Sequence, residues 1–232
     1  MQGKKIVVLT GAGISAESGL STFRDAGGLW EGYDVYQVAS PDGWAKDPEL
    51  VLRFYNERRR QLKSVQPNSA HIALAKLEEK YNVIIITQNV DNLHERAGST
   101  NIIHLHGELT RSRSTVPPYN VYDIGYNDIN MGDLCEKGAQ LRPDVVWFGE
   151  SVPLMTDAAL VASSADILIV VGTSLVVYPA AGLLDYVPGE AYKYIIDPSK
   201  PNVYGIHKNL EFITEKATTG TPPLIERLLN LK

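Results

Sequence analysis

The hydrophobic pattern of this chain alternates between short apolar runs and longer amphipathic stretches. Four runs have the length and the β-branched composition of strands buried on both faces, and they occupy residues 6–9, 83–86, 166–171 and 192–196. Shorter apolar runs at 102–105 and 212–213 add two more strands. Buried strands separated by helical segments favour a parallel sheet with helices on both faces. We therefore predict an α/β fold with a Rossmann-like, doubly wound parallel sheet and a small inserted subdomain.

Helical spacing and helix-starting prolines recur between these strands. We expect helices over 48–62, from Pro67 onward, before Gly98, from Pro179 onward and over 222–231. Residues 108–141 are irregular, polar and rich in turns, which is typical of a small excursion from the sheet. Together the segments indicate a single domain over 1–232, with the Rossmann-like core in 1–30, 82–107 and 144–232, and small-subdomain or helical insertions at about 31–81 and 108–143.

A glycine-rich turn follows the first strand. Gly11, Gly13 and Ala16 form G-x-G-x-x-A. The first glycine of such a turn allows a sharp bend, the second lets a pyrophosphate approach the backbone, and the third small residue lets a helix pack on the strand. A dehydrogenase would carry an acidic residue about 20 positions further on, whereas here a long insertion precedes the next strand. The turn predicts phosphate binding under extra structure, and a glycine turn that binds nothing remains the alternative.

Polar residues follow the next two predicted strands. Gln88, Asn89 and Asp91 come after 83–86, at the edge where ligands of open α/β sheets bind. They either contact such a ligand or cap the loop. His104 and His106 share one face of an extended segment, because the side chains of a strand repeat every two residues. A histidine there is either a base near neutral pH or a structural residue.

Two further segments carry candidate binding chemistry. Gly172, Thr173 and Ser174 form a second small-residue turn after 166–171, suited to phosphate or ribose contacts. The apolar segment 144–150, DVVWFGE, breaks at Gly149. It is either an ordinary buried strand or an extended edge that pairs with a peptide through backbone hydrogen bonds.

Composition narrows the class of protein. A hydrophobic content of 44% over 232 residues suffices for a packed core. The net charge of −5 argues against nucleic-acid binding by bulk charge. No apolar run approaches the ~20 residues that a membrane helix needs, and the early first strand leads us to expect no signal peptide. The single cysteine, Cys135, excludes an intramolecular disulfide and a cysteine-rich metal site. We expect a cytoplasmic protein with no nucleic-acid and no membrane partner.

Five motifs, in order along nearly the whole chain, resemble the sirtuin family of NAD-dependent protein lysine deacylases. They are GAGISAESGLSTFRD, TQNVDNLHERAG, LHGEL, RPDVVWFGE and VGTSLVVYPAA. The resemblance implies that NAD is consumed as a co-substrate, that the partners are acyl-lysine proteins or peptides, and that the products are free lysine, nicotinamide and 2′-O-acyl-ADP-ribose. Two alternatives use the same NAD site: a mono-ADP-ribosyltransferase and a non-catalytic sensor of NAD or ADP-ribose.

The resemblance also implies roles for individual residues. His106 would be the general base, which deprotonates a ribose hydroxyl, and Asn89 a second catalytic residue. Contacts with NAD are implied for Gly11, Ala12, Gly13, Ile14, Ser15, Glu17, Ser18, Phe23, Arg24, Gln88, Asn89, Val90, Asp91, Gly172, Thr173, Ser174, Asp197 and Ala217. The backbone of the protein substrate would pair with Val146, Trp147, Phe148 and Gly149.

The chain departs from the family pattern at two places. Most sirtuins carry two cysteine pairs that bind a structural zinc, but Arg113, Ser114 and Thr115 stand in place of the first pair. Because a tetrahedral structural site needs four ligands, we expect no structural zinc. Ile195 stands where an asparagine often contacts the adenine ribose, and its side chain cannot form a hydrogen bond.

The Y-x-x-R pair of Tyr55 and Arg58 indicates which acyl group is removed. Residues three apart share one face of a helix, and this pair resembles the family branch that removes succinyl and malonyl groups. Arg58 can bind a carboxylate bidentately, Tyr55 adds a hydroxyl donor, and the small Ala26 leaves room for a longer acyl chain. We expect a desuccinylase and demalonylase that is also a deacetylase. The alternative is that Tyr55 packs in the core and that Arg58 belongs to a solvated run with its neighbours 59 and 60.

Overall fold

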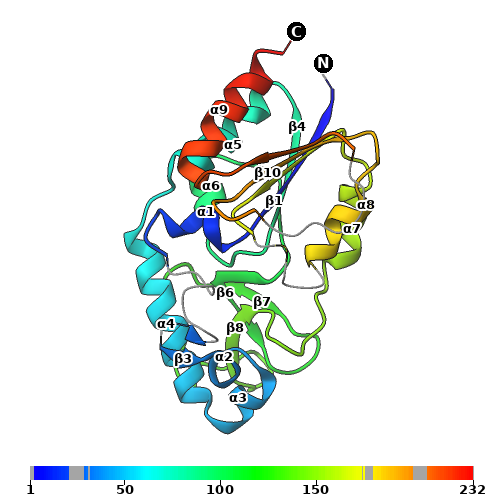
Figure 1. Cartoon of the computed structure of the whole chain (residues 1–232). Coiled ribbons are helices and arrows are strands. Elements are labelled where there is room, and N and C mark those ends of the chain that lie inside the picture. Colours follow the sequence, from blue (N-terminus) through cyan, green and yellow to red (C-terminus); the bar gives the residue numbers. More distant parts are fainter. Residues whose placement is uncertain are drawn as a thin grey trace.

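A parallel six-stranded sheet forms the centre of the computed structural model, which describes residues 3–20, 29–30 (backbone only), 32–173, 175, 180–200 and 208–231. The strand order is β11-β10-β9-β1-β4-β5, and every neighbouring pair is parallel (Figure 1). The strands are β1 (Lys5–Thr10), β4 (Asn82–Thr87), β5 (Ile102–His104), β9 (Ile167–Val171), β10 (Tyr192–Ile196) and β11 (Leu210–Ile213). The predicted α/β fold with a doubly wound parallel sheet is confirmed.

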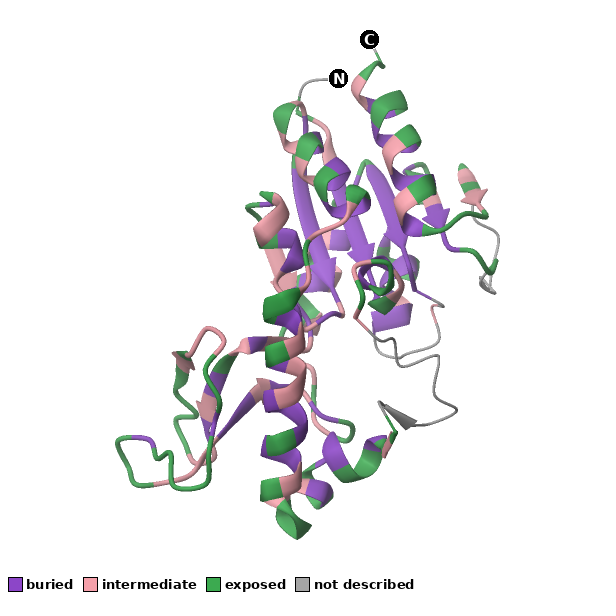
Figure 2. Ribbon diagram, turned by 90° about the vertical axis from the view of Figure 1, so that its left-hand side faces the viewer, coloured by how far each residue is buried: buried purple, intermediate pink, exposed green. Residues whose placement is uncertain are grey.

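Alternate residues of the strands face two separate hydrophobic clusters, one on each side of the sheet. Ile6 and Val8 pack with α1 (Ala12–Ala16), α5 (Ser69–Lys76) and α9 (Ala217–Leu229). Val7 and Leu9 pack with α7 (Met155–Ala162), η3 (Ala180–Gly182) and α8 (Leu183–Tyr186). The buried strands between two layers of half-exposed helices are visible in Figure 2. The remaining helical elements of the core are η2 (Leu77–Glu79) and α6 (Leu93–Ala97).

A second, smaller unit lies beyond the carboxyl ends of the parallel strands (Figure 1). We call it the small subdomain, residues 32–65 and 107–150. It contains the antiparallel sheet β7-β6-β8, formed by β6 (Gly107–Ser114), β7 (Val121–Asp123) and β8 (Leu141–Val145). Its helices are α2 (Val35–Val38), α3 (Pro41–Lys46) and α4 (Pro48–Ser64), and β3 (Tyr33–Asp34) pairs with β2 (Leu29–Trp30). A third hydrophobic cluster, which includes Phe54 and Trp147, holds these elements together.

The small sheet is an element that the hydrophobic pattern does not reveal. Residues 108–141 were expected to be irregular, yet β6 runs through the first seven of them and pairs on both edges. Its inward positions include Ser112 and Ser114, which are buried although they are polar. The side chains of β6 alternate between buried and more exposed positions, but its sequence does not alternate between apolar and polar residues. The hydrophobic pattern therefore predicts no strand here.

The predicted boundaries of the last helix and of the segment after residue 143 differ from the structure. The last helix was expected from Pro222, but α9 begins at Ala217 and contains both prolines. Pro222 leaves the Thr218 carbonyl without its helical donor, and the Ser69 hydroxyl donates to that oxygen at 3.0 Å instead. The segment 144–150 was expected to be a buried strand or an extended edge, but β8 runs from Leu141 to Val145, and Glu150 N–H donates to the Trp147 carbonyl and closes a turn.

The helices between β1 and β4 pack in two different places. α4 contributes Val51, Phe54 and Leu62 to the cluster of the small subdomain. α5 instead packs on the parallel sheet through Ala70 and Leu74. Its start is shifted from Pro67 to Ser69, with Asn68 and His71 forming a reciprocal cap. No helix within the described residues is both long enough and apolar enough to cross a membrane.

Candidate active site

Two loops cross at the carboxyl edge of the parallel sheet, at the point where the strand order changes direction. From β1 the chain continues to β4 and β5 on one side, while β9, β10 and β11 lie on the other. Gly11 N–H donates to the Val171 carbonyl at 3.1 Å, and Gly13 N–H donates to the Gly172 carbonyl at 2.8 Å. A Cβ on Gly13 would lie 2.7 Å from the Gly172 oxygen. Open α/β sheets bind nucleotides at such a switch point, so these loops fit a pyrophosphate.

The loop after β4 places two predicted polar residues against the glycine turn. The Asn89 amide nitrogen donates to the Gly11 carbonyl at 3.2 Å and to the Ser15 hydroxyl at 3.1 Å. The Ser15 hydroxyl donates in turn to the Asp91 carboxylate at 2.9 Å. All three of these polar side chains are buried, and burial raises the pKa of Asp91, against the effect of its hydrogen bonds. The structure thus brings the glycine turn and the Q-N-x-D cluster into one polar network.

His106 lies two residues beyond β5, next to the same loop. Its Nδ1 lies 2.9 Å from the Gln88 carbonyl oxygen, which can only accept, so Nδ1 carries the proton. In the neutral ring Nε2 is then the acceptor. Burial lowers the pKa of His106, although the Gln88 carbonyl partly opposes this effect. The ring is therefore held neutral near neutral pH, with a lone pair on Nε2 that can take a proton.

The segment after β8 is joined to the backbone of the candidate base. Val146 N–H donates to the His106 carbonyl at 2.9 Å, and Phe148 N–H donates to the Ala39 carbonyl at 2.9 Å. Gly149 adopts φ +90°, which glycine tolerates best. The predicted substrate residues 146–149 therefore form an extended segment and a turn beside His106.

An ion network that the sequence analysis missed fixes this segment. Both oxygens of Glu150 accept from Arg142 at 2.8 Å, and one of them also accepts from Trp147 N–H at 2.8 Å. The Arg142 guanidinium carbon lies 3.5 Å from the centre of the Trp147 ring. Residues 142, 147 and 150 all belong to the R-P-D-V-V-W-F-G-E motif, so the motif was the only signal. The apolar–polar pattern of this segment does not show that these three side chains contact one another.

Tyr55 and Arg58 occupy different environments on α4. Tyr55 is fully buried, its hydroxyl oxygen accepts from Trp147 Nε1 at 3.1 Å, and burial raises its pKa. Arg58 has only 14% of its side chain exposed, its guanidinium lies over the Phe54 ring, and its Nη2 is 3.8 Å from a Glu57 oxygen. Within the described part of the chain, Arg58 Nε and Nη1 have no hydrogen-bond partner.

The alternative of a solvated basic run is wrong for two of the three arginines. Arg59 is fully buried and donates to the Leu109 carbonyl and the Asn56 side chain, both at 2.7 Å. Burial lowers its pKa to about 10. Only Arg60 is exposed, at 3.6 Å from Asp128. The other part of that alternative, Tyr55 in the core, agrees with its burial.

Several other predicted contacts serve the fold in this structure. Glu17 accepts from the Thr218 backbone and hydroxyl at the start of α9, where Ala217 is buried. The Ser18 hydroxyl accepts from Asn68 at 2.9 Å. Gln88 reaches the Thr173 hydroxyl at 3.3 Å, which connects the loops after β4 and β9.

The remaining residues predicted to contact NAD or substrate lie in different environments. Ala12 is exposed, whereas Ile14 is buried in the first cluster. The Val90 carbonyl accepts from Leu109 N–H, and Asp197 is buried and accepts from Ser199. Four predicted residues, Phe23, Arg24, Ala26 and Ser174, lie outside the described residues.

The two departures from the family pattern have simple surroundings. Cys135 accepts a hydrogen bond from the Ser114 hydroxyl at 3.3 Å, within the β6–β8 region. Ile195 is buried in the second hydrophobic cluster.

The side chains of Glu95, His104 and Glu108 lie close together, and they form hydrogen bonds and ion pairs of their own: His104 with Glu95, and Glu108 with Arg111, both at 2.7 Å.

The fold and the crossing loops define an α/β protein of the nucleotide-binding, Rossmann-like class with an inserted small subdomain. The model of the Sir2 family matches residues 11–179, so this chain belongs to the Sir2, or sirtuin, family. A protein of Helicobacter pylori strain J99 named NAD-dependent protein deacylase is 54% identical over 228 residues, covering 98% of this chain and 97% of that one. A Bacteroides thetaiotaomicron protein of the same name is 53% identical, covering 97% and 98%. The crystal structure of a Sir2 homologue in complex with NAD superposes with a TM-score of 0.87 at 41% identity, covering 97% of this chain and 90% of that one. The family expected from the five motifs is confirmed.

Proposed function

We propose that this chain is an NAD-dependent protein lysine deacylase that prefers acyl groups ending in a carboxylate, succinyl and malonyl, and also removes acetyl. Membership of the Sir2 family and the names of its relatives support the deacylase activity. The preference for an acidic acyl group rests on one observation, the buried guanidinium of Arg58 with two unpaired nitrogens.

The residues around the crossing loops divide the work of the reaction. NAD, when bound, supplies the ADP-ribosyl group that takes the acyl group from lysine as nicotinamide leaves and water is consumed. The backbone at 11–13 and 172–173 fits its pyrophosphate, since no side chain separates the two loops at Gly13 and Gly172. Asn89 and Asp91 are held by Ser15 at the same edge, suited to ribose hydroxyl and carboxamide groups.

His106 has the properties that a general base requires. Its Nδ1–H is fixed by the Gln88 carbonyl, and its pKa is lowered, so that Nε2 can accept the proton of a ribose hydroxyl at neutral pH. Its own carbonyl holds Val146, the first residue of the proposed substrate segment. A sensor of NAD or ADP-ribose has no use for a base tied to a peptide-binding segment in this way.

The environment of Arg58 favours an anionic ligand. A charge that is largely removed from water is costly unless it is paired, and Arg58 pairs only distantly with the half-exposed Glu57. A carboxylate on the acyl chain would accept from this guanidinium and remove that cost. Tyr55, on the same helix, is linked to the proposed substrate segment because its hydroxyl oxygen accepts a hydrogen bond from Trp147 Nε1.

Arg58→Met tests the acyl preference, and Arg60→Met is its matched control, because Arg60 lies on the same helix but is exposed. We expect Arg58→Met to lower kcat/KM for a succinyl-lysine peptide about 10- to 150-fold, the equivalent of roughly 1.5–3 kcal/mol for a hydrogen bond to a charged group. Deacetylation should change much less, and Arg60→Met should alter neither activity. Equal losses for both acyl groups in Arg58→Met, or a wild type that removes acetyl but not succinyl, would reject the preference.

Mass spectrometry of the products distinguishes the deacylase from the transferase. A deacylase yields free lysine peptide together with nicotinamide and acyl-ADP-ribose. A mono-ADP-ribosyltransferase instead labels a protein with ADP-ribose and leaves the acyl-lysine intact. Labelled protein without deacylated peptide would contradict the proposal.

A further inference from the structure

Two histidines hold the loop that carries Gln88 and Asn89. His106 bonds the Gln88 carbonyl through Nδ1 at 2.9 Å. His104, two residues earlier and the last residue of β5, places its Nδ1 3.3 Å from the Asn89 carbonyl oxygen. The two histidines thus contact the carbonyl groups of Gln88 and Asn89, two successive residues of the loop after β4. The contact made by His106 belongs to the proposed general base. The contact made by His104 has no role in the function proposed above.

The second nitrogen of His104 has an acceptor as well. Its Nε2 lies 2.7 Å from a carboxylate oxygen of Glu95, on α6. A backbone carbonyl and an ionised carboxylate can only accept hydrogen bonds, and a neutral imidazole has one N–H. Both bonds therefore exist together only when His104 is an imidazolium.

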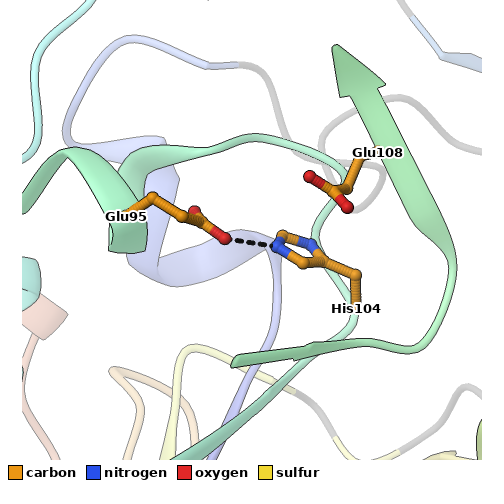
Figure 3. A group of neighbouring side chains, drawn as sticks. All are labelled: Glu95, His104 and Glu108. Atoms are coloured by element: carbon orange, nitrogen blue, oxygen red, sulfur yellow. Dashed lines mark hydrogen bonds and ion pairs between the residues drawn. The ribbon is translucent and has the colours of Figure 1, made fainter. Parts of the chain in front are cut away.

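The surroundings of His104 are suited to a buried positive charge. Figure 3 shows the Glu95 carboxylate at the tip of the ring and the Glu108 carboxylate of β6 beside it; one ligand atom from each of the three side chains lies within 4.8 Å of the others. Within the described residues, the other titratable groups that interact with His104 are Asp91 and His94, and Glu108 is itself paired with Arg111 at 2.7 Å. Burial keeps His94 uncharged by lowering its pKa. Burial lowers the pKa of His104, but the hydrogen bond and charge of Glu95, with Glu108 and the Asn89 carbonyl, outweigh it and raise the pKa.

A hydrogen bond to the Asn89 carbonyl affects the position of the Asn89 side chain. The side chain of the same residue contacts Gly11 and Ser15, and its N–H donates to the Thr87 hydroxyl at 3.0 Å. Movement of the peptide group after Asn89 therefore moves an amide that faces the nucleotide loops. Loss of one proton from His104 removes one of its two bonds, either the one to Asn89 or the one to Glu95.

We propose that His104, as an imidazolium paired with Glu95, is a positioning residue that holds Asn89 in its reactive orientation, and that its deprotonation sets the alkaline limit of turnover. The inference rests on the proposed role of Asn89 in deacylation. His106 must be neutral and His104 charged, so activity is confined between the titrations of two histidines on one segment. Among the described residues, the buried His106 ring is bonded to a carbonyl, whereas His104 is bonded to a carbonyl and a carboxylate, and this difference accounts for their opposite charge states.

Glu95→Gln tests the proposal, since the amide keeps the size of the side chain and an acceptor oxygen but removes the charge. We expect the alkaline limb of the kcat–pH profile to move down by about one pH unit, so that turnover above that limb falls roughly tenfold. Turnover near the acid limb and the KM for NAD should stay close to wild type. Glu78→Gln is the control, because Glu78 accepts two hydrogen bonds from Thr100 and none from a histidine; its profile should not move. An unmoved alkaline limb in Glu95→Gln would overturn the proposal.

Nitrogen-15 NMR of the histidine side chains provides a readout that does not depend on the acyl group. In the wild type near pH 7, both ring nitrogens of His104 should carry protons, and the Val90 amide resonance should titrate with the same midpoint, because its peptide group contains the Asn89 carbonyl. A neutral His104 at pH 7 would overturn the proposal. The kinetic assays use acetyl- and succinyl-peptides in parallel, so a failed acyl preference leaves this test intact. If neither peptide is turned over, the deacylase proposal fails, and the NMR titration still decides the state of His104.

Discussion

The side chain of His106 illustrates how one backbone contact determines the chemistry of a residue. The Gln88 carbonyl places the ring proton on Nδ1, and burial holds the pKa of the ring below its ordinary value. Because the ring stays neutral to lower pH, the acid limb of the reaction should lie below about pH 6.5, the ordinary histidine pKa.

Replacement of His106 should therefore remove turnover and little else. We expect His106→Ala to lower deacylation by on the order of 10²–10⁴, the usual contribution of a positioned general base. Binding of NAD, measured by calorimetry, and the melting temperature should change little, because the loops that fit the nucleotide do not include this ring. Near-normal turnover in a folded variant would exclude His106 as the base.

The three consecutive arginines of α4 show what sequence can and cannot predict at this scale. Each residue of a helix is rotated by about 100° from the last, so neighbours in a charge run face different surroundings. Arg58 lies over Phe54, Arg59 reaches the Leu109 carbonyl, and Arg60 reaches Asp128 at the surface. The motif Y-x-x-R identified the first of them. The burial of the second depends on the position of β6, which local pattern does not contain.

At the scale of elements, the crossing of the loops after β1 and β9 is the most demanding contact in the site. Gly172 adopts φ +64°, and a Cβ there would lie 2.3 Å from the backbone nitrogen of Ile14. Neither loop can retreat without releasing the hydrogen bond from Gly13 to Gly172. The crossing therefore requires glycine for two reasons, the backbone angle and the lack of space.

Gly172→Ala should separate these two reasons when it is compared with Gly138→Ala. Gly138 has a similar φ of +74°, but a Cβ there would meet nothing within 4 Å. Both variants bear the strain of a left-handed residue, of order 1–3 kcal/mol, whereas Gly172→Ala must also displace the loop. We expect both to lower the melting temperature and only Gly172→Ala to weaken NAD binding by tenfold or more in a calorimetric titration. Equal NAD affinity in the two variants would refute the close crossing.

Predictability differed between the two sheets for a physical reason. The central strands β1, β4 and β9 are apolar on both faces, so their continuous hydrophobic runs could be located from the sequence. The small sheet buries Ser112 and Ser114 and was missed. The start of α9 was also missed, since the donor that compensates for Pro222 comes from Ser69, which is remote in sequence.

At the scale of the whole molecule, two buried histidines couple stability to pH. His71 and His94 pack against each other with ring centres 5.0 Å apart, behind β1 and β4, and both are fully buried. Burial lowers the pKa of His71 from 6.5 to about 4 and that of His94 well below 6.5. Between these values the unfolded chain binds protons that the folded protein does not, so stability falls as the pH falls.

We expect the free energy of unfolding to decrease from pH 6.5 downward, with His71 accounting for up to about 3 kcal/mol by pH 4. His71→Gln should be less stable at neutral pH but should show a shallower decline, because the titration of His71 is gone. Urea unfolding curves recorded between pH 4 and 8 measure both quantities. A decline as steep as in the wild type would show that His71 does not contribute.

The separate hydrophobic cluster of the small subdomain has a consequence for local unfolding. Phe54, Leu109, Val145 and Trp147 belong to a cluster distinct from the two clusters of the parallel sheet, and this cluster also takes in Leu93 of α6. A unit with its own core can open cooperatively at a free energy below that of global unfolding. The proposed peptide segment 146–149 belongs to this unit, whereas the crossing loops belong to the sheet. Each substrate should then protect a different set of amides from hydrogen exchange, the acylated peptide those of the small subdomain and NAD those at the edge of the sheet, because a ligand stabilises the state that binds it.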